Sequence, residues 1–268
     1  MTFIDLGHIC LFCVTQGPVH APVLLLVHGW GGDGRTWSRH AEELSRDHRV
    51  LVPDLRGHGR SDVPRRGNTP AAMAADLAAL VDRLGAGPVT AVGHSMGGQV
   101  VNLLAVHHSR TVRSVVVLDP AHGAHGPELD EIPRRLADYQ AHGAEAAADF
   151  VAGAFGPEAP AGLRTAQIRT MLGTPGHVIA QSYAGMYTDP GAVGIRPHSE
   201  AYLSRRPCPA LTVWTSAEAA QWERGTLRVP GSRVDHWTGT GHYLHEEHPD
   251  RTIALIRAWT ASDIGKAS

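Results

Sequence analysis

The stretch from Val89 to Gly98 combines a short apolar run with the pattern Gly-x-Ser-x-Gly and a helix-like continuation. This order predicts a strand, a tight turn with Ser95 at its apex, and a helix that begins directly after the turn. Gly93 and Gly97 carry no Cβ, so they permit the close backbone approach that such a turn needs. A serine hydroxyl exposed at a helix N-terminus is a candidate nucleophile. The alternative is that Ser95 only caps the helix.

Length and charge restrict the classes of protein to which the chain can belong. With 268 residues, it is long enough for one large α/β domain that carries an insertion. The formal net charge of -2 leaves no basic stripe for nucleic acid and no polybasic segment for a membrane surface. We therefore expect a small organic substrate as the partner, and neither a nucleic acid nor a membrane. The oligomeric state stays open.

The N-terminal sequence and the cysteines indicate a cytoplasmic protein. The first residues lack a basic segment followed by an apolar one, and no apolar run approaches the length of a membrane span. The three cysteines are an odd number, which argues against a disulfide framework. Cys10 and Cys13 form a Cys-x-x-Cys, but on a predicted strand two residues three apart point to opposite faces. We expect a structural role for both and no metal site.

Apolar runs and helical patterns alternate along most of the chain. This alternation predicts an α/β fold with a mostly parallel central sheet and helices on both faces. The predicted strands are 6–14, 22–27, 48–53, 89–92, 112–118, 210–214 and 233–237. The predicted helices are 36–44, 69–84, 96–108, 217–224 and 250–260.

The alternation breaks between residues 121 and 204. This region contains only helix-like segments separated by Gly-Pro punctuation, at 132–142, 144–154, 163–172 and 178–187. Because it follows the C-terminal end of a strand, it is expected to lie over the edge where open α/β sheets bind ligands. We predict a core formed by residues 1–120 and 205–268, with residues 121–204 inserted after the strand at 112–118 as a helical cap.

A serine nucleophile needs a base and a group that orients the base. His242 is the strongest candidate base, because it follows the last predicted strand on a glycine-flanked loop. That position brings it to the same sheet edge as Ser95. His245 and His248 are expected at the surface around the last helix, and a metal site formed by these three histidines is disfavoured.

Four motifs together resemble the α/β-hydrolase fold superfamily, at residues 28–30 (His-Gly-Trp), 54–61 (Asp-Leu-Arg-Gly-His-Gly-Arg-Ser), 93–98 (Gly-His-Ser-Met-Gly-Gly) and 239–242 (Gly-Thr-Gly-His). The match spans nearly all of the chain outside the predicted cap and is similar to small capped esterases, lactonases and cofactor-free peroxidase-like members. The resemblance implies an oxyanion hole formed by the backbone N–H groups of Trp30 and Met96, and no cofactor. The 54–62 loop is expected to be latched by salt bridges.

The acid of the triad has two candidates. Most members of the superfamily take it from the end of the strand at 210–214, where Glu218 lies nearby but no aspartate is present. Asp119 ends the strand after the Ser95 helix, and this position resembles the acid of zearalenone-hydrolase-like lactonases. We predict Asp119 and keep Glu218 as the alternative. The true acid holds the imidazole in the required tautomer and stabilises its charged form.

The main hypothesis is a serine hydrolase that cleaves a hydrophobic carboxylic ester or lactone through an acyl-enzyme. One alternative is a cofactor-free tailoring enzyme of the same fold, such as a perhydrolase, a C–C hydrolase or a cyclase. A second is a non-catalytic protein that binds a small molecule. The resemblance argues against an epoxide hydrolase or dehalogenase, which would carry aspartate where Ser95 stands. His94 is predicted to pack beneath the turn, and Tyr183, Met186 and Tyr187 line the pocket or form the interior of the cap.

Overall fold

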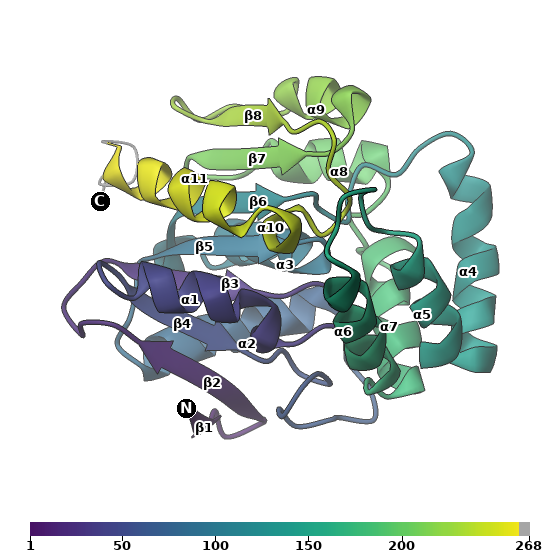
Figure 1. Ribbon diagram of the computed structural model, residues 1–268, viewed down its shortest axis with the longest axis horizontal. Helices are drawn as coiled ribbons and strands as arrows, with labels where there is room; N and C mark the ends of the chain where they lie inside the picture. Colours follow the sequence, from purple (N-terminus) through teal and green to yellow (C-terminus); the bar gives the residue numbers. More distant parts are fainter. Residues whose placement is uncertain (263–268) are drawn as a thin grey trace.

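The computed structural model describes residues 1–262, which form an eight-stranded sheet flanked by helices (Figure 1). The strand order is β1-β2-β4-β3-β5-β6-β7-β8. The strands are β1 (Thr2–Asp5), β2 (Cys10–Gln16), β3 (Val23–Val27), β4 (Arg49–Pro53), β5 (Val89–His94), β6 (Val112–Leu118), β7 (Ala210–Trp214) and β8 (Arg233–His236). All neighbours from β4 to β8 pair in parallel, so the prediction of a mostly parallel sheet is confirmed.

The N-terminal edge differs from the prediction of one strand at 6–14. The chain forms a hairpin instead, in which β1 pairs antiparallel with β2, and β2 pairs antiparallel with β4. Gly7 has a φ of 84°, a conformation that glycine adopts without steric cost, and its N–H donates to Asp5 Oδ1 at 2.7 Å. The turn at Gly7 therefore splits the apolar run into two strands.

Helices cover both faces of the sheet (Figure 1). One face carries α1 (Ser38–Leu44) and α11 (Pro249–Ala261), and the other carries α2 (Pro70–Arg83) and α3 (Met96–His107). Thr69 caps α2 by accepting a hydrogen bond from the Ala72 N–H, as a threonine before a helix-starting proline predicts. The remaining short elements outside residues 121–204 are η1 (Gly34–Trp37), η2 (Ser109–Thr111), α9 (Ala217–Arg224) and α10 (Leu244–Glu247).

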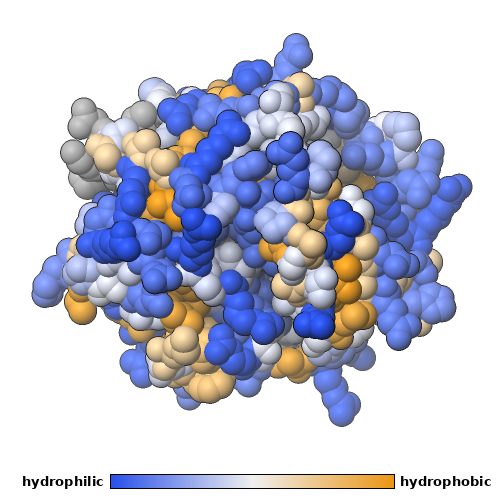
Figure 2. Space-filling model, in the orientation of Figure 1, coloured by the Kyte–Doolittle hydropathy of each residue, from blue (hydrophilic) through white to orange (hydrophobic). Residues whose placement is uncertain are grey.

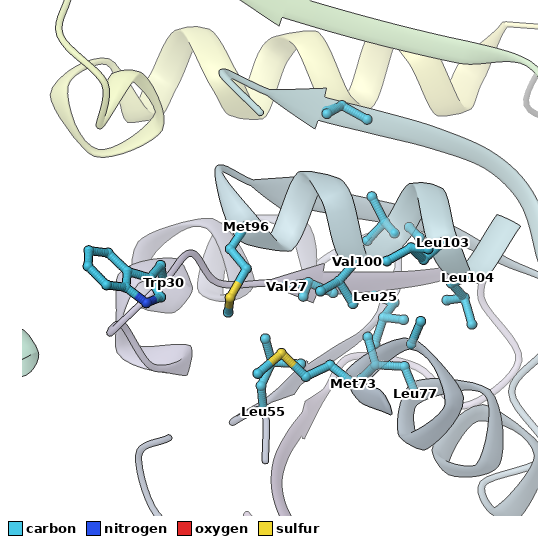
Figure 3. Close-up of a cluster of buried hydrophobic side chains, with 14 of the residues drawn as sticks. Leu25, Val27, Trp30, Leu55, Met73, Leu77, Met96, Val100, Leu103 and Leu104 are labelled. Atoms are coloured by element: carbon cyan, nitrogen blue, oxygen red, sulfur yellow. The ribbon is translucent and has the colours of Figure 1, made fainter. Parts of the chain in front are cut away.

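Each face of the sheet has its own hydrophobic cluster. Leu24, Leu26 and Trp259 belong to the cluster under α1 and α11. Met96 belongs to the other cluster, where it points toward Leu55 and Met73, whereas Trp30 lies at the edge of the group (Figure 3). The alternation of side chains along the buried strands supplies both clusters.

Residues 121–204, which we call the insert, leave the sheet after β6 and return before β7. The insert contains five helices: α4 (Glu128–His142), α5 (Ala144–Ala152), α6 (Ala161–Leu172), α7 (Gly176–Tyr187) and α8 (Arg196–Leu203). Four correspond to predicted segments, whereas α8 is an addition. An isolated β-bridge between Ala124 and Ile195 joins the start of the insert to the approach of α8.

The insert lies at one end of the sheet, on the right in Figure 1. Hydrophilic residues cover most of the face seen in Figure 2, and hydrophobic residues gather in small patches, some of them over the insert. Phe150 and Leu172 of the insert are among the exposed large hydrophobic residues. None of the helices within residues 1–262 is long and apolar enough to cross a lipid bilayer.

Candidate active site

Ser95 occupies the turn between β5 and α3, as predicted. Its φ of 53° and ψ of -119° lie in a region that residues other than glycine rarely adopt. A Cβ at Gly93 would meet the Gly97 backbone, and a Cβ at Gly97 would meet the carbonyl oxygens of Val27 and His28. The Ser95 N–H donates to Leu118 O at 3.0 Å, which joins the turn to the end of β6. Glycine on both sides therefore makes the turn possible.

Asp119 is the residue immediately after β6, and it has a φ of 42°. Within residues 1–262, Ser95 and Asp119 are the two residues other than glycine with positive φ. Strained backbone of this kind is concentrated at functional sites. The Asp119 N–H donates to Val213 O at 2.8 Å, so the neighbouring strand β7 holds the strained residue in place.

The Asp119 carboxylate contacts His242, which follows β8. His242 Nδ1 lies 2.7 Å from Asp119 Oδ2. A carboxylate only accepts hydrogen bonds, so Nδ1 carries a proton, and in the neutral imidazole Nε2 then keeps a lone pair. Asp119 Oδ1 accepts two further hydrogen bonds, from the N–H and the hydroxyl of Thr215, at 2.9 and 2.8 Å.

The environment of Asp119 favours its charged form. Burial acts to raise the pKa of the carboxyl, but the hydrogen bond from His242, the charge of the imidazolium form of His242 and the two Thr215 donors lower it below its ordinary value. Sequence reasoning missed Thr215, although its position directly after β7 places it at the same sheet edge.

Glu218, the alternative acid, faces other partners. Its Oε1 lies 2.8 Å from His125 Nε2 and 3.3 Å from an Arg196 guanidinium nitrogen, and two-thirds of its side chain is exposed. His242 is not among its ion-pair or hydrogen-bond partners in the described chain. The structure therefore brings His242 together with Asp119 and not with Glu218.

His94 is buried near the Ser95 turn, as predicted, but its contact with the His242 backbone was not predicted. His94 is almost fully buried, and its Nε2 lies 2.8 Å from the carbonyl oxygen of His242. Because that oxygen only accepts, His94 Nε2 carries a proton. Burial lowers the pKa of His94 to about 3, so its ring is neutral.

The prediction that His245 lies at the surface is wrong. His245 is fully buried, with its ring centroid 4.3 Å from that of His94 and 4.5 Å from that of Trp37. The short helix α10 turns this side chain inward, toward the end of β5. His248 is partly buried before α11.

The predicted oxyanion donors lie at neighbouring positions of the sheet edge. Trp30 follows β3, Met96 begins α3 after Ser95, and β3 pairs with β5. Within the part of the chain that the structure describes, the backbone N–H groups of Trp30 and Met96 donate to no other protein group. Both are thus available to a ligand. The Met96 side chain is buried in the core and, unlike the Trp30 side chain, does not shape the cavity.

Ser95, Asp119 and His242 border one cavity of about 340 Å³ between the sheet edge and the insert. This size falls in the usual range for small-molecule sites. The predicted residues Tyr183, Met186 and Tyr187 line it while also packing in the interior of the insert. Sequence reasoning missed several further lining residues, among them Ile132, Arg135, Tyr139 and Phe150.

The Ser95 hydroxyl makes no hydrogen bond to another group among residues 1–262. Contacts between a nucleophile and its base are often long without substrate and shorten when substrate binds. The cavity places the hydroxyl and His242 on the wall of the same space.

A second carboxylate–histidine pair lies beside the cavity and was also missed. The Glu223 carboxylate is fully buried and accepts from Thr212 and Trp214, each at 2.7 Å. His122 Nε2 lies 3.1 Å away, and an Arg206 guanidinium nitrogen lies 3.3 Å away. Burial acts to raise the pKa of Glu223, but His122, Arg206 and the Thr212 hydroxyl lower it to about 2.

The loop at 54–62 has the latching role expected of it. Asp54 is almost fully buried and accepts from the N–H groups of Gly34 and Arg60, at 2.8 and 2.9 Å. The Arg60 guanidinium adds an ion pair at 3.4 Å. These contacts tie the loop to the segment after β3.

A model of the alpha/beta hydrolase fold family matches residues 22–169, more than half of the chain. The chain belongs to the alpha/beta hydrolase family. The part that matches runs from β3 through the Ser95 turn into the insert.

Relatives of this alpha/beta hydrolase include several enzymes. Lipase LipV of Mycobacterium tuberculosis is 40% identical over 116 residues, which are 43% of this chain and 44% of the relative. A fluoroacetate dehalogenase of a Burkholderia species is 36% identical over 121 residues, 43% of this chain and 39% of the relative. The matched stretches span less than half the length of these curated relatives.

The structure of a thermophilic esterase from Thermogutta terrifontis with malate bound matches this alpha/beta hydrolase with a TM-score of 0.80 and 28% identity. The match covers 94% of this chain and 93% of the esterase. The likeness therefore includes the insert as well as the sheet.

Proposed function

We propose that the protein is a serine hydrolase that cleaves a carboxylic ester or lactone through an acyl-enzyme intermediate. The observation that carries this proposal is the Asp119–His242 pair at 2.7 Å, which borders the same cavity as Ser95 on its strained turn. A weak nucleophile, a base with a free lone pair and a carboxylate that orients the base are the parts that acyl transfer needs.

In the first half of the proposed reaction, Ser95 Oγ attacks the substrate carbonyl carbon while His242 Nε2 takes the hydroxyl proton. The negative charge that develops on the carbonyl oxygen is held by the N–H groups of Trp30 and Met96, each worth about 3–4 kcal/mol in the transition state. His242 then gives its proton to the leaving alkoxide, and the acyl group remains on Ser95.

In the second half, His242 takes a proton from water, whose oxygen attacks the acyl carbon. When the second tetrahedral intermediate collapses, the acid is released and the proton returns to Ser95 Oγ. Asp119 keeps the proton on His242 Nδ1 throughout and stabilises the imidazolium. No metal or cofactor takes part in these proposed steps.

The walls of the cavity support a hydrophobic acyl or aromatic lactone substrate. Trp30, Tyr139, Phe150 and Tyr183 bring aromatic rings to the space beside Ser95. Aromatic side chains bury large apolar areas of a ligand. In this proposal the insert acts as a cap that shapes access, and residues 1–120 and 205–268 act as the catalytic core. The esterase and lipase names of the relatives agree with this substrate class.

A fluorophosphonate probe tests the proposal without knowledge of the substrate. We expect the intact mass of the wild-type protein to increase by one probe adduct, and Ser95→Ala to remain unlabelled. Asp119→Asn is expected to label much more slowly, whereas Glu218→Gln labels at the wild-type rate. An adduct that persists on Ser95→Ala would exclude Ser95 as the nucleophile. A panel of p-nitrophenyl esters and aromatic lactones then defines the substrate class.

A further inference from the structure

The insert makes hydrogen bonds to the loop that carries one of the proposed oxyanion donors. Trp30 Nε1–H donates to the carbonyl oxygen of Ile179 at 3.1 Å and to Ser182 Oγ at 3.0 Å, both on α7. The Thr174 hydroxyl, between α6 and α7, donates to the carbonyl oxygen of Gly31 at 3.1 Å. Two insert side chains thus hold adjacent residues of the core loop.

The hydrogen bond from Trp30 to Ser182 has a defined direction. Ser182 is fully buried, and its hydroxyl proton points to Val178 O at 2.6 Å, which leaves the oxygen free to accept from Trp30. The Trp30 ring packs against Tyr139 and Tyr183 of the insert, with centroids 4.8 and 5.7 Å apart. The indole therefore belongs to the packed interior of the insert.

The insert and the core loop also approach each other closely at the backbone of Gly31. Gly31 has a φ of 64°, and a Cβ at this position would collide with the Met171 side chain of α6. The Gly31 N–H donates to His58 Nε2 at 3.3 Å. The loop is thus held from the core by His58 and from the insert by Thr174 and Ser182.

The loop that carries His242 has a similar link to the insert. The His242 N–H donates to Ala154 O at 2.7 Å, and the Gly156 N–H donates to Glu247 Oε1 at 3.1 Å. The proposed oxyanion donor and the proposed base are therefore both tied to the insert, through two different segments of it.

We infer that Ser182 and Thr174 are positioning residues for the oxyanion hole, acting through the Trp30 indole and the Gly31 carbonyl. The inference rests on the proposed function, because it concerns the alignment of the Trp30 N–H with the developing oxyanion. A small displacement of an aligned group can lower a rate by about a hundredfold. The docked insert then does more than enclose the substrate, since its docking completes the alignment of the site.

Ser182→Ala and the nearly isosteric Thr174→Val test the inference. We expect either change to lower kcat about tenfold with KM changed less than about twofold, as loss of a transition-state interaction requires. Affinity for a trifluoromethyl ketone, whose adduct with Ser95 carries an oxyanion, should fall by the same factor as kcat/KM. A control is Thr188→Val, because among residues 1–262 the hydroxyl of the exposed Thr188, just after α7, bonds only to Ala184 O.

A double-mutant cycle with Trp30→Phe separates positioning from simple packing. Trp30→Phe keeps the backbone N–H and removes the indole donor, so Ser182→Ala should cause no further loss of ketone affinity in that background. Thermal unfolding of each variant is measured alongside.

Three outcomes would overturn the inference: unchanged kcat and ketone affinity in both hydroxyl variants, an equal loss in Thr188→Val, or fully additive effects in the cycle. Fluorophosphonate labelling of the wild type distinguishes failure of the positioning role from failure of the proposed function. A wild type that labels at Ser95, with insensitive hydroxyl variants, contradicts only the positioning role. A wild type that neither labels nor hydrolyses the ester panel contradicts the proposed function, and the positioning role with it.

Discussion

Two carboxylate–histidine pairs, Asp119–His242 and Glu223–His122, each take one member from the segment after β6, but their surroundings differ. Asp119 and His242 are partly open to the cavity, with side chains 11% and 21% exposed. The side chains of Glu223 and His122 are shielded from solvent, at 0% and 2% exposed, although His122 also borders the cavity. The same chemical pair is thus placed in two different environments within one half of the molecule.

The difference lies in which nitrogen of the histidine meets the carboxylate. His242 uses Nδ1, so its Nε2 remains available on the wall of the cavity. His122 uses Nε2, and Glu223 is also held by Arg206, Thr212 and Trp214. A buried carboxylate with several partners is costly to remove, because its partners are left uncompensated. A carboxylate that orients a histidine with a free distal nitrogen instead equips that histidine as a base. The comparison therefore supports the proposed catalytic role for Asp119–His242 and predicts a structural role for Glu223–His122.

Asp119→Asn should have the largest effect on activity. The amide can donate to His242 Nδ1 and so favours the wrong tautomer, which lowers kcat by about 10³–10⁴-fold. Asparagine tolerates the positive φ at this position, so the melting temperature is expected to change little. Steady-state kinetics and thermal unfolding check both parts. Near-normal kcat in a folded variant would remove Asp119 from the reaction.

Glu223→Gln should have the opposite effect, a loss of stability with little change in activity. It leaves the buried Arg206 guanidinium without its carboxylate partner, which costs about 3–5 kcal/mol of unfolding free energy. Urea unfolding at pH 7 measures this loss, and kcat of the folded fraction is expected to stay within about threefold of wild type. Unchanged stability together with a large loss of kcat would reverse the two assignments.

The low pKa of Glu223 predicts how that stability difference varies with pH. The folded pKa of about 2 lies below the ordinary value of 4.5, so the carboxylate contributes fully above pH 5 and loses its contribution as pH falls toward 2. The difference between wild type and Glu223→Gln should therefore narrow by about 1 kcal/mol between pH 7 and pH 4. Urea titrations over this range provide the measurement. If the difference in unfolding free energy instead widens as the pH falls, the predicted direction is wrong.

Glu218→Gln should have the smallest effect. The exposed ion pairs of Glu218 with His125 and Arg196 are worth little in water, so kcat and stability should stay within about twofold and 1 kcal/mol of wild type. Steady-state kinetics of Glu218→Gln and Asp119→Asn, measured under the same conditions, compare the two candidate acids directly. A loss as large as that of Asp119→Asn would restore Glu218 as the acid.

The positions that depend on local sequence and strand ends could be predicted. Gly93 and Gly97 mark the turn, and a parallel sheet brings the ends of β5, β6 and β8 to one edge, where Ser95, Asp119 and His242 meet. These placements follow from steric rules and from the direction of the strands.

The contacts that depend on packing between distant segments could not be predicted. No local pattern shows that His245 turns inward or that Glu223 collects four donors, because each depends on where neighbouring helices dock. The hairpin at Gly7 was missed because a single apolar run can contain a turn, and α8 because its sequence is short and polar. The link from Trp30 to Ser182 likewise joins residues far apart in the chain.

The insert leaves and re-enters the core between two paired strands, β6 and β7, with the Ala124–Ile195 bridge near its base. This bridge joins the chain entering the insert to the chain approaching α8, so a segment of another length can be grafted between Ala124 and Ile195 without a change in sheet register. The graft must still provide an acceptor for the Trp30 indole and a donor for the Gly31 carbonyl. It must also provide an acceptor for the His242 N–H, which donates to Ala154 O. Substrate selectivity can thus be engineered by exchanging the segment while equivalents of these hydrogen bonds are kept.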